Sequence, residues 1–167
     1  MIFDGYRNDY PTQRVFNLTR SGHAGMQRYG TFPWSGDVHR GWEGMRAQLP
    51  IMLSMGMNGV GYMSSDLGGF NGGVYDQELF TRWVQFGAFT PIMRPHGSNG
   101  IASEPIYYSD PYKSVVRDYS KLRYRMLPYN YSLAYENSMT GTPLARPMNY
   151  NDPVSYTHLT LPTTSRV

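Results

Sequence analysis

Several polar side chains in this sequence stand in settings that suit acid–base chemistry. Asp37 ends the run Trp34-Ser35-Gly36-Asp37, in which a bulky indole can lower the local dielectric constant and raise the pKa of a carboxyl group. A carboxylic acid with a raised pKa can serve as a general acid. An Asp in front of a helix is also a common N-cap, so these residues by themselves leave both roles open for Asp37.

A second carboxylate, Asp66, and the basic segment Arg94-Pro95-His96 follow further along the chain. Asp66 is followed by two glycines and Phe70, so the backbone can approach a ligand and the ring can line a sugar pocket. A plain turn with a packed Phe is the alternative. Arg94 and His96 flank a proline, which suits the recognition of hydroxyl groups, whereas a structural ion pair and a capping His are the alternative for these two.

The loops that carry these side chains follow short apolar runs. Such runs, bounded by glycine or proline, predict β-strands. The strands are expected at residues 14–19, 32–35, 59–63 and 91–94, the first of them buried. Arg20, Asp66 and His96 would then each follow the end of a strand.

Amphipathic helices alternate with these strands. The first is expected over residues 4–10 and the second over 41–57, with Pro50 as a kink. Asp76 is expected to cap the third helix, and a fourth follows Pro111. The expected buried faces are Trp42, Met45, Leu49, Met52 and Leu53 in the second helix, Leu79, Phe80, Trp83, Val84 and Phe86 in the third, and Val115, Tyr119, Leu122 and Met126 in the fourth.

Alternation of strands and helices predicts parallel βα units. In a (β/α)8 barrel the loops after the strands form the active-site face, where Arg20, Asp66 and His96 are expected. About four βα units are expected here, half of the eight in a closed barrel. Residues 142–154 are expected to begin a following β domain, and residues 155–167 to be a disordered or non-native tail.

The composition excludes several classes of protein. The absence of cysteine rules out a disulfide scaffold, a zinc ribbon and a thiol nucleophile, and the four histidines lack metal-ligand spacing. A net charge of +3 is too small to indicate a nucleic-acid partner, and Arg117, Lys121 and Arg125 are expected on a solvated helix face. No apolar run reaches the roughly 18 residues needed to span a bilayer, and no signal-peptide pattern is present, so no membrane partner is expected and the compartment stays open.

Six motifs, in order along the chain, resemble glycoside hydrolase family 31. They are Leu18-Thr19-Arg20-Ser21, Gln27-Arg28-Tyr29-Gly30, Trp34-Ser35-Gly36-Asp37, Ser65-Asp66-Leu67-Gly68-Gly69-Phe70, Arg82-Trp83-Val84-Gln85-Phe86-Gly87-Ala88-Phe89 and Arg94-Pro95-His96. The resemblance covers roughly residues 1–150. It implies an α/β fold in which residues 1–141 are the C-terminal half of a (β/α)8 TIM barrel, its last four βα units, and residues 142–154 open a β-sandwich domain.

The resemblance also implies an activity and a role for each residue. Asp37 matches the acid/base of a retaining α-glycoside hydrolase acting on terminal α-linked glucose or xylose of oligosaccharides. The positions that match the lining of the pocket for the non-reducing sugar are Arg20, Trp34, Asp66, Phe70 and His96. The family needs no metal or organic cofactor, and the expected partner is an oligosaccharide substrate. The oligomeric state is left open.

A glycosidase that retains the configuration of the anomeric carbon requires a second carboxylate about 5–5.5 Å from the first. In the family this nucleophile follows the fourth strand, whereas this chain begins at the helix after that strand, which carries Asp4 and Asp9. The chain alone is therefore expected to be inactive. Val38 and His39 follow Asp37 where many relatives have Asn, a form that resembles a bacterial subgroup including 4-α-glucosyltransferases. Two alternatives to a hydrolase therefore stay open. The protein could be a 4-α-glucosyltransferase on the same scaffold, or a sugar-binding relative without catalytic activity.

Overall fold

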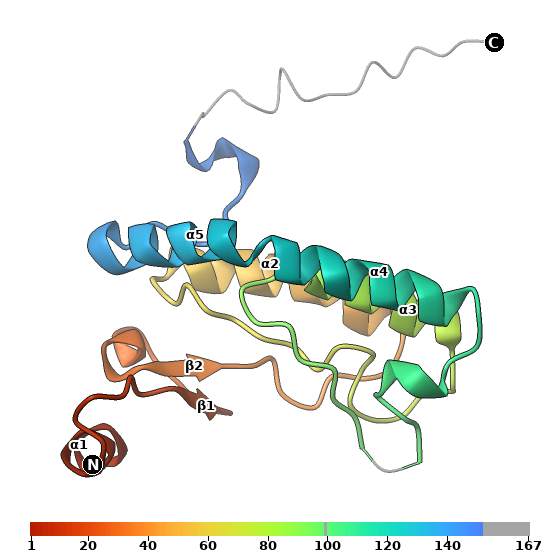
Figure 1. The fold of residues 1–167 in the computed structure, drawn as a ribbon, viewed down its shortest axis with the longest axis horizontal. Helices are drawn as coiled ribbons and strands as arrows, with labels where there is room; N and C mark the ends of the chain where they lie inside the picture. The colour runs from red at the N-terminus through yellow and green to blue at the C-terminus, as the bar shows by residue number, and fades with distance from the viewer. Residues whose placement is uncertain (99, 152–167) are drawn as a thin grey trace.

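The computed structural model of the chain describes residues 1–98 and 100–151. The helices after residue 41 form a layer over short strands and loops, and the N-terminal helix lies on the other side of the strands (Figure 1). The helices are α1 (Ile2–Asp9), α2 (Trp42–Met57), α3 (Gln77–Gly87), α4 (Tyr112–Arg125) and α5 (Leu127–Thr140). The strands are β1 (Asn17–Thr19) and β2 (Thr31–Pro33). Three short 3-10 helices complete the list: η1 (Met26–Tyr29), η2 (Pro105–Tyr107) and η3 (Met148–Tyr150).

The extended segments lie side by side in chain order. β1 and β2 pair in parallel, with Leu18 opposite Phe32. Two single parallel bridges continue the series, Trp34 with Ser64 and Leu67 with Pro95. The segments predicted as strands at 59–63 and 91–94 contain no strand residue; the bridge residues Ser64 and Pro95, directly after them, mark the third and fourth strand positions. The predicted α/β class and the parallel order are confirmed.

The connection between β1 and β2 differs from the prediction of four βα units. It contains the single-turn helix η1 in place of an α-helix. Gly25 and Gly30, at its two ends, have φ values of 95° and 59°. These left-handed conformations stop the turn from extending into a longer helix. Only three of the four strand positions in the described residues are therefore followed by an α-helix.

The first strand is shorter and less buried than predicted. Of residues 14–19 only Asn17–Thr19 form a strand, and Phe16 is 62% exposed. β1 is the outermost strand of the described sheet, so no described strand covers its outer edge. On its inner side the Phe16 ring lies 5.2 Å from that of Phe32, which in turn lies 4.7 Å from the Tyr62 ring.

Helix α3 carries the centre of the core, as predicted. Its N-cap is Asp76, whose Oδ1 accepts a hydrogen bond of 3.0 Å from the Leu79 amide. The predicted inner residues Leu79, Phe80, Trp83 and Val84 are buried. Phe86, also predicted to be buried, is only partly buried. The buried residues pack in two directions, Phe80 and Val84 against Tyr108 and against Val116 of α4, and Leu79 and Trp83 against Leu67.

The buried faces of α2 and α4 are displaced from those predicted. In α2 the residues Gln48, Met52 and Gly56 are buried, whereas Trp42 and Leu49 are exposed. Met52 is buried as predicted, and Met45 packs against the core cluster of Leu67, Leu79 and Trp83. Gly56 allows residues 143–145 to lie close against the helix. In α4 the buried residue is Val116, not Val115, because Val116 packs against the core cluster of Phe80, Val84 and Tyr108.

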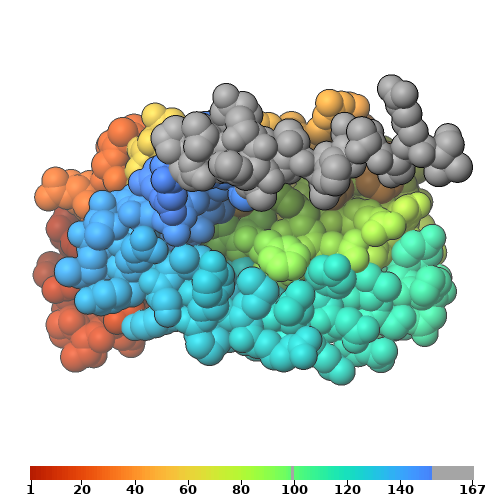
Figure 2. Space-filling view, turned by 90° about the horizontal axis from the view of Figure 1, so that it is seen from above, coloured from red at the N-terminus to blue at the C-terminus, as the bar shows by residue number. Residues whose placement is uncertain are grey.

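Helix α5 was not predicted. It follows α4 almost in line, and the two form one long edge of the molecule (Figures 1 and 2). Pro128 in its first turn and Gly141, at φ 79° after its end, are the sequence signals that indicate its bounds. Arg117, Lys121 and Arg125 are exposed on α4, as expected.

The C-terminal part of the described chain contains no strand. Residues 142–151 form loops and η3, so the β domain expected at 142–154 stays a prediction. The tail expected at 155–167 lies outside the described residues. Within residues 1–98 and 100–151, no helix has the length and apolar character required to cross a membrane.

Candidate active site

Arg20 and Asp37 meet at the ends of the two paired strands. Arg20 directly follows β1, and Asp37 lies four residues after β2. Because the strands are parallel neighbours, their ends lie at the same edge, where Arg20 Nη1 donates a 2.8 Å hydrogen bond to Asp37 Oδ1. The Asp37 side chain is one-third exposed, so a ligand can reach it. The capping alternative for Asp37 is wrong, because α2 begins at Trp42 with Gly41 as its N-cap.

The indole of Trp34 lies beside two cations. The guanidinium carbons of Arg20 and Arg94 are 5.9 Å and 5.7 Å from the centre of its ring. Both distances suit cation–π attraction. Trp34 Nε1 is buried and has no hydrogen-bond partner in the described part of the chain. Trp34 therefore joins the Arg20–Asp37 pair to the loop that carries Arg94.

Asp66 and Arg94 form the buried ion pair of the site. Asp66 is fully buried, and Arg94 Nη2 donates to its Oδ1. Burial raises the pKa of Asp66, because desolvation disfavours the charged carboxylate; the Asp37 charge adds to this rise, whereas Arg94 and His96 oppose it. The structural pairing considered for Arg94 is confirmed.

Phe70 and His96 stack on one another beside this pair. Their ring centres are 5.5 Å apart and the ring planes differ by 30°. The Phe70 amide donates to Val38 O over 2.8 Å, and the Ser98 amide donates to Phe70 O over 2.7 Å. The loop with Phe70 therefore lies between the segments that follow Asp37 and His96.

Unpaired polar atoms gather at this edge. Four buried side-chain atoms around the two ion pairs have no partner among residues 1–98 and 100–151: Trp34 Nε1, Ser35 Oγ, Asp66 Oδ2 and Arg94 Nε. Buried polar groups are normally satisfied, so a cluster of unpaired donors and acceptors marks this edge as a place where a polar ligand could supply partners. An adjoining cavity of about 500 Å³ is lined by Arg20, Gly22, Pro33, Trp34, Ser35, Gly36, Asp37, Met55 and Met63.

The structure thus brings the predicted residues together. Arg20, Trp34 and Asp37 line the cavity, whereas Asp66, Phe70 and His96 do not. Arg94 links the two groups, because it lies over the Trp34 ring and donates to Asp66. Ser35 was missed as a site residue; its place between Trp34 and Asp37 was the available signal. No group of three or more His, Asp or Glu side chains that could hold a metal ion occurs in the described residues.

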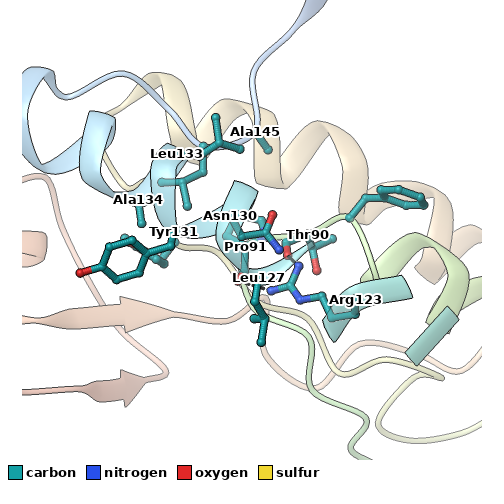
Figure 3. Close-up of a pocket in the computed structure, with 12 residues that line it drawn as sticks. Thr90, Pro91, Arg123, Leu127, Asn130, Tyr131, Leu133, Ala134 and Ala145 are labelled. Carbon is teal, nitrogen blue, oxygen red and sulfur yellow. Dashed lines mark hydrogen bonds between the residues drawn. The ribbon is translucent and has the colours of Figure 1, made fainter. Parts of the chain in front are cut away.

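A second cavity lies beside α5 and is lined also by Thr90 and Pro91 (Figure 3). It has a volume of about 410 Å³ and lies between α5 and the segment before the fourth strand position. Its lining is mostly apolar and includes Pro91, Leu127, Tyr131 and Leu133. No carboxylate or histidine lines it, so it lacks acid–base groups. The cavity beside Asp37 is therefore the candidate active site.

Comparison with known proteins agrees with this geometry. The sequence pattern of the Glycosyl hydrolases family 31 TIM-barrel domain matches residues 1–133. The chain belongs to glycoside hydrolase family 31. The TIM-barrel fold predicted from the motifs is confirmed, and the described residues hold four neighbouring strand positions of it.

Relatives within family 31 include two glycosidases. An α-xylosidase of Saccharolobus solfataricus is 39% identical over 151 residues, covering 88% of this chain and 20% of that protein. "Alpha-glucosidase 2" of Bacillus thermoamyloliquefaciens is 39% identical over 142 residues, covering 84% of this chain and 18% of that protein. The structure of a Flavobacterium johnsoniae family 31 dextranase complexed with glucose matches with a TM-score of 0.86 at 36% identity, covering 91% of this chain and 20% of that one. The chain thus spans about a fifth of the length of these relatives.

Proposed function

We propose that the complete enzyme containing this chain is a retaining α-glycoside hydrolase acting on terminal α-linked glucose or xylose of oligosaccharides. The observation that carries the proposal is the accessible Asp37 carboxylate, paired with Arg20 beside a cavity of about 500 Å³. The glycosidase names of the family 31 relatives support the substrate class.

Asp37 is the proposed acid/base. As an acid it protonates the glycosidic oxygen of the leaving sugar, and as a base it then takes a proton from the attacking water. The Arg20 guanidinium, 2.8 Å away, orients the carboxylate through these two steps. A retaining mechanism also needs a carboxylate nucleophile. Asp66 is unsuited to that role because its Oδ1 is held by Arg94, so the nucleophile is assigned to a part of the enzyme outside this chain.

The other predicted residues form the proposed pocket for the terminal sugar. Arg20, Asp66 and His96 are the proposed partners of its hydroxyl groups, and Oδ2 of Asp66 is unpaired in the described part of the chain. Trp34 and Phe70 form the apolar walls on which the sugar ring packs. Positioning of this kind lowers the barrier by holding the reacting bond beside the acid.

The domain assignment follows the same proposal. Residues 1–141 supply the last four strand positions of the barrel, its C-terminal half. Residues 142–154 begin the β domain after it. The loop ends that carry Arg20, Asp37, Asp66 and His96 then lie on the active-site face of the barrel.

The test measures hydrolysis of aryl α-glucosides, aryl α-xylosides and short oligosaccharides by the complete enzyme. Asp37→Ala should lower kcat/KM on oligosaccharides by roughly 10²–10⁴-fold, and far less on a glycosyl fluoride, whose leaving group needs no proton. Asp118→Ala, which removes an exposed carboxylate on α4, is the matched control. Full activity of Asp37→Ala on oligosaccharides would contradict the assignment.

The products separate the alternatives. Release of monosaccharide at high substrate concentration supports hydrolysis, whereas longer oligosaccharides indicate a transglucosylase on the same scaffold. A wild-type enzyme that binds glucose or xylose but cleaves no α-glycoside would be a non-catalytic relative.

A further inference from the structure

Arg40 is a buried cation three residues after Asp37. It is only 8% exposed. Its Nη1 donates to Gly72 O over 2.8 Å and its Nη2 donates to Phe70 O over 3.1 Å. No carboxylate in the described residues forms an ion pair with it. A buried charge that lacks an opposite charge is a poor source of stability, so its place in the structure points to another role.

The glycine loop from Gly69 to Gly73 closes around Arg40. Gly69 and Gly73 have φ values of 84° and 65°, and a Cβ at either position would overlap Arg40. The Arg40 amide also donates to Asn71 O over 2.8 Å. Side chain and backbone of Arg40 together therefore bind three consecutive carbonyls of the loop, those of Phe70, Asn71 and Gly72.

Three parts of the candidate site meet at the Phe70 carbonyl. This oxygen accepts from Arg40 Nη2 and from the amide of Ser98, which lies two residues after His96. The Phe70 ring stacks on His96. Gly97 is packed against the same guanidinium, since a Cβ there would lie 3.1 Å from Arg40 Nη2. The position of Phe70 thus depends on Arg40 as well as on its own loop.

We infer that Arg40 is a positioning residue that joins the Asp37 loop to the Phe70 loop and holds the Phe70–His96 wall in place relative to Asp37. Arg40 acts through the carbonyls of Phe70 and Gly72 and does not touch substrate, because it is buried beneath the loop. The effect on catalysis rests on the proposed function; the effect on the loop does not.

Arg123 provides a matched control. This half-buried guanidinium also binds carbonyls, donating to Ala88 O over 3.1 Å, to Thr90 O and to Pro91 O over 2.8 Å. Within the described part of the chain it too lacks an acidic partner. It belongs to α4 and lines the second cavity, not the cavity beside Asp37 (Figure 3). Replacing either arginine removes the same kind of contact, but only Arg40 binds the loop that carries Phe70.

The experiment compares Arg40→Met, Arg40→Lys and Arg123→Met in the complete enzyme. Amide hydrogen exchange of the segment with Phe70 and Asn71 should accelerate about tenfold or more in Arg40→Met and stay unchanged in Arg123→Met. With an aryl α-glycoside, Arg40→Met should lower kcat/KM by roughly 10- to 100-fold, chiefly through a higher KM. Arg40→Lys should recover part of both effects, because its ammonium can still donate to the carbonyls.

A purely structural role would give another pattern. If Arg40→Met and Arg123→Met lower the unfolding temperature alike and leave KM and loop exchange unchanged, the inference is overturned. If Arg40→Met fails to fold, Arg40→Lys is the deciding variant. It is expected to keep part of the defect, so amide exchange of the Phe70 segment and a KM equal to those of wild type would refute the role. A wild-type enzyme without glycosidase activity, whose loop exchange still accelerates in Arg40→Met, would refute the proposed function and retain the loop inference.

Discussion

The guanidinium of Arg20 donates a 2.8 Å hydrogen bond to the carboxylate of Asp37, across 17 residues of sequence. The pair joins the C-terminal ends of β1 and β2, and both side chains remain accessible to solvent. An exposed ion pair contributes little to stability, typically about 0–1 kcal/mol. The main effect of the Arg20–Asp37 pair is therefore to orient the Asp37 carboxylate beside the cavity.

Removal of Arg20 should therefore lower activity more than stability. Arg20→Ala is expected to reduce kcat/KM on an aryl α-glycoside by roughly 10- to 100-fold, because Asp37 and the sugar both lose a fixed partner. Arg20→Lys should be intermediate, since an ammonium lacks the planar fork of a guanidinium. Arg28→Ala, which removes an exposed cation from the same loop, is the control. Wild-type kinetics in Arg20→Ala would contradict this role.

Removal of Arg94 should destabilise the protein, because Asp66 would remain buried without its cation. Arg94→Met is expected to cost about 3–5 kcal/mol at pH 7. The double variant Arg94→Met/Asp66→Asn should recover much of this loss. Thermal unfolding of the complete enzyme, followed by tryptophan fluorescence, measures both changes. An equal loss in the single and double variants would show that the ion pair is not the cause.

The cost of removing Arg94 should also depend on pH. Burial raises the pKa of Asp66 in the folded protein above its unfolded value of about 3.9. The folded state therefore holds the proton more tightly, and this stabilising contribution is complete below the unfolded pKa and is lost as pH rises through the folded pKa. Without Arg94, which opposes the rise, the folded pKa moves higher still. The difference in unfolding temperature between Arg94→Met and wild type should thus shrink from pH 7 toward pH 4, and a constant difference would refute this.

Replacing Gly69 by alanine should destabilise the protein more than replacing Gly141, although the two glycines have similar backbone conformations. Gly69 and Gly141 have φ values of 84° and 79°, but only at Gly69 would a Cβ overlap a neighbour, Arg40. Gly141→Ala is expected to cost about 1–2 kcal/mol of conformational strain. Gly69→Ala adds overpacking of about 1–3 kcal/mol. Equal unfolding temperatures for the two variants would show that the loop can move away from Arg40.

The parts of the fold that the sequence predicted are those governed by local chemistry. The Asp76 cap and the buried face of α3 depend on residues within one helix, so periodicity was sufficient. The inward side of α2 was predicted in part: Met52 is buried, whereas Trp42 and Leu49 are exposed, and the close approach of residues 143–145 to Gly56 is a contact that periodicity could not show. Likewise, Val116 replaces Val115 in the core because Tyr108 and α3 occupy that side of α4.

For the site, the sequence by itself determined which side chains follow the strand ends, since residues at the ends of parallel neighbouring strands must share one edge. It could not decide between an N-cap and an accessible acid for Asp37, nor find the partners Arg20 and Arg94. Those depend on distances between atoms 17 and 28 residues apart along the chain. Only the tertiary structure buries Asp66 and leaves Asp37 accessible to solvent, because desolvation and ion pairing arise from neighbours in space.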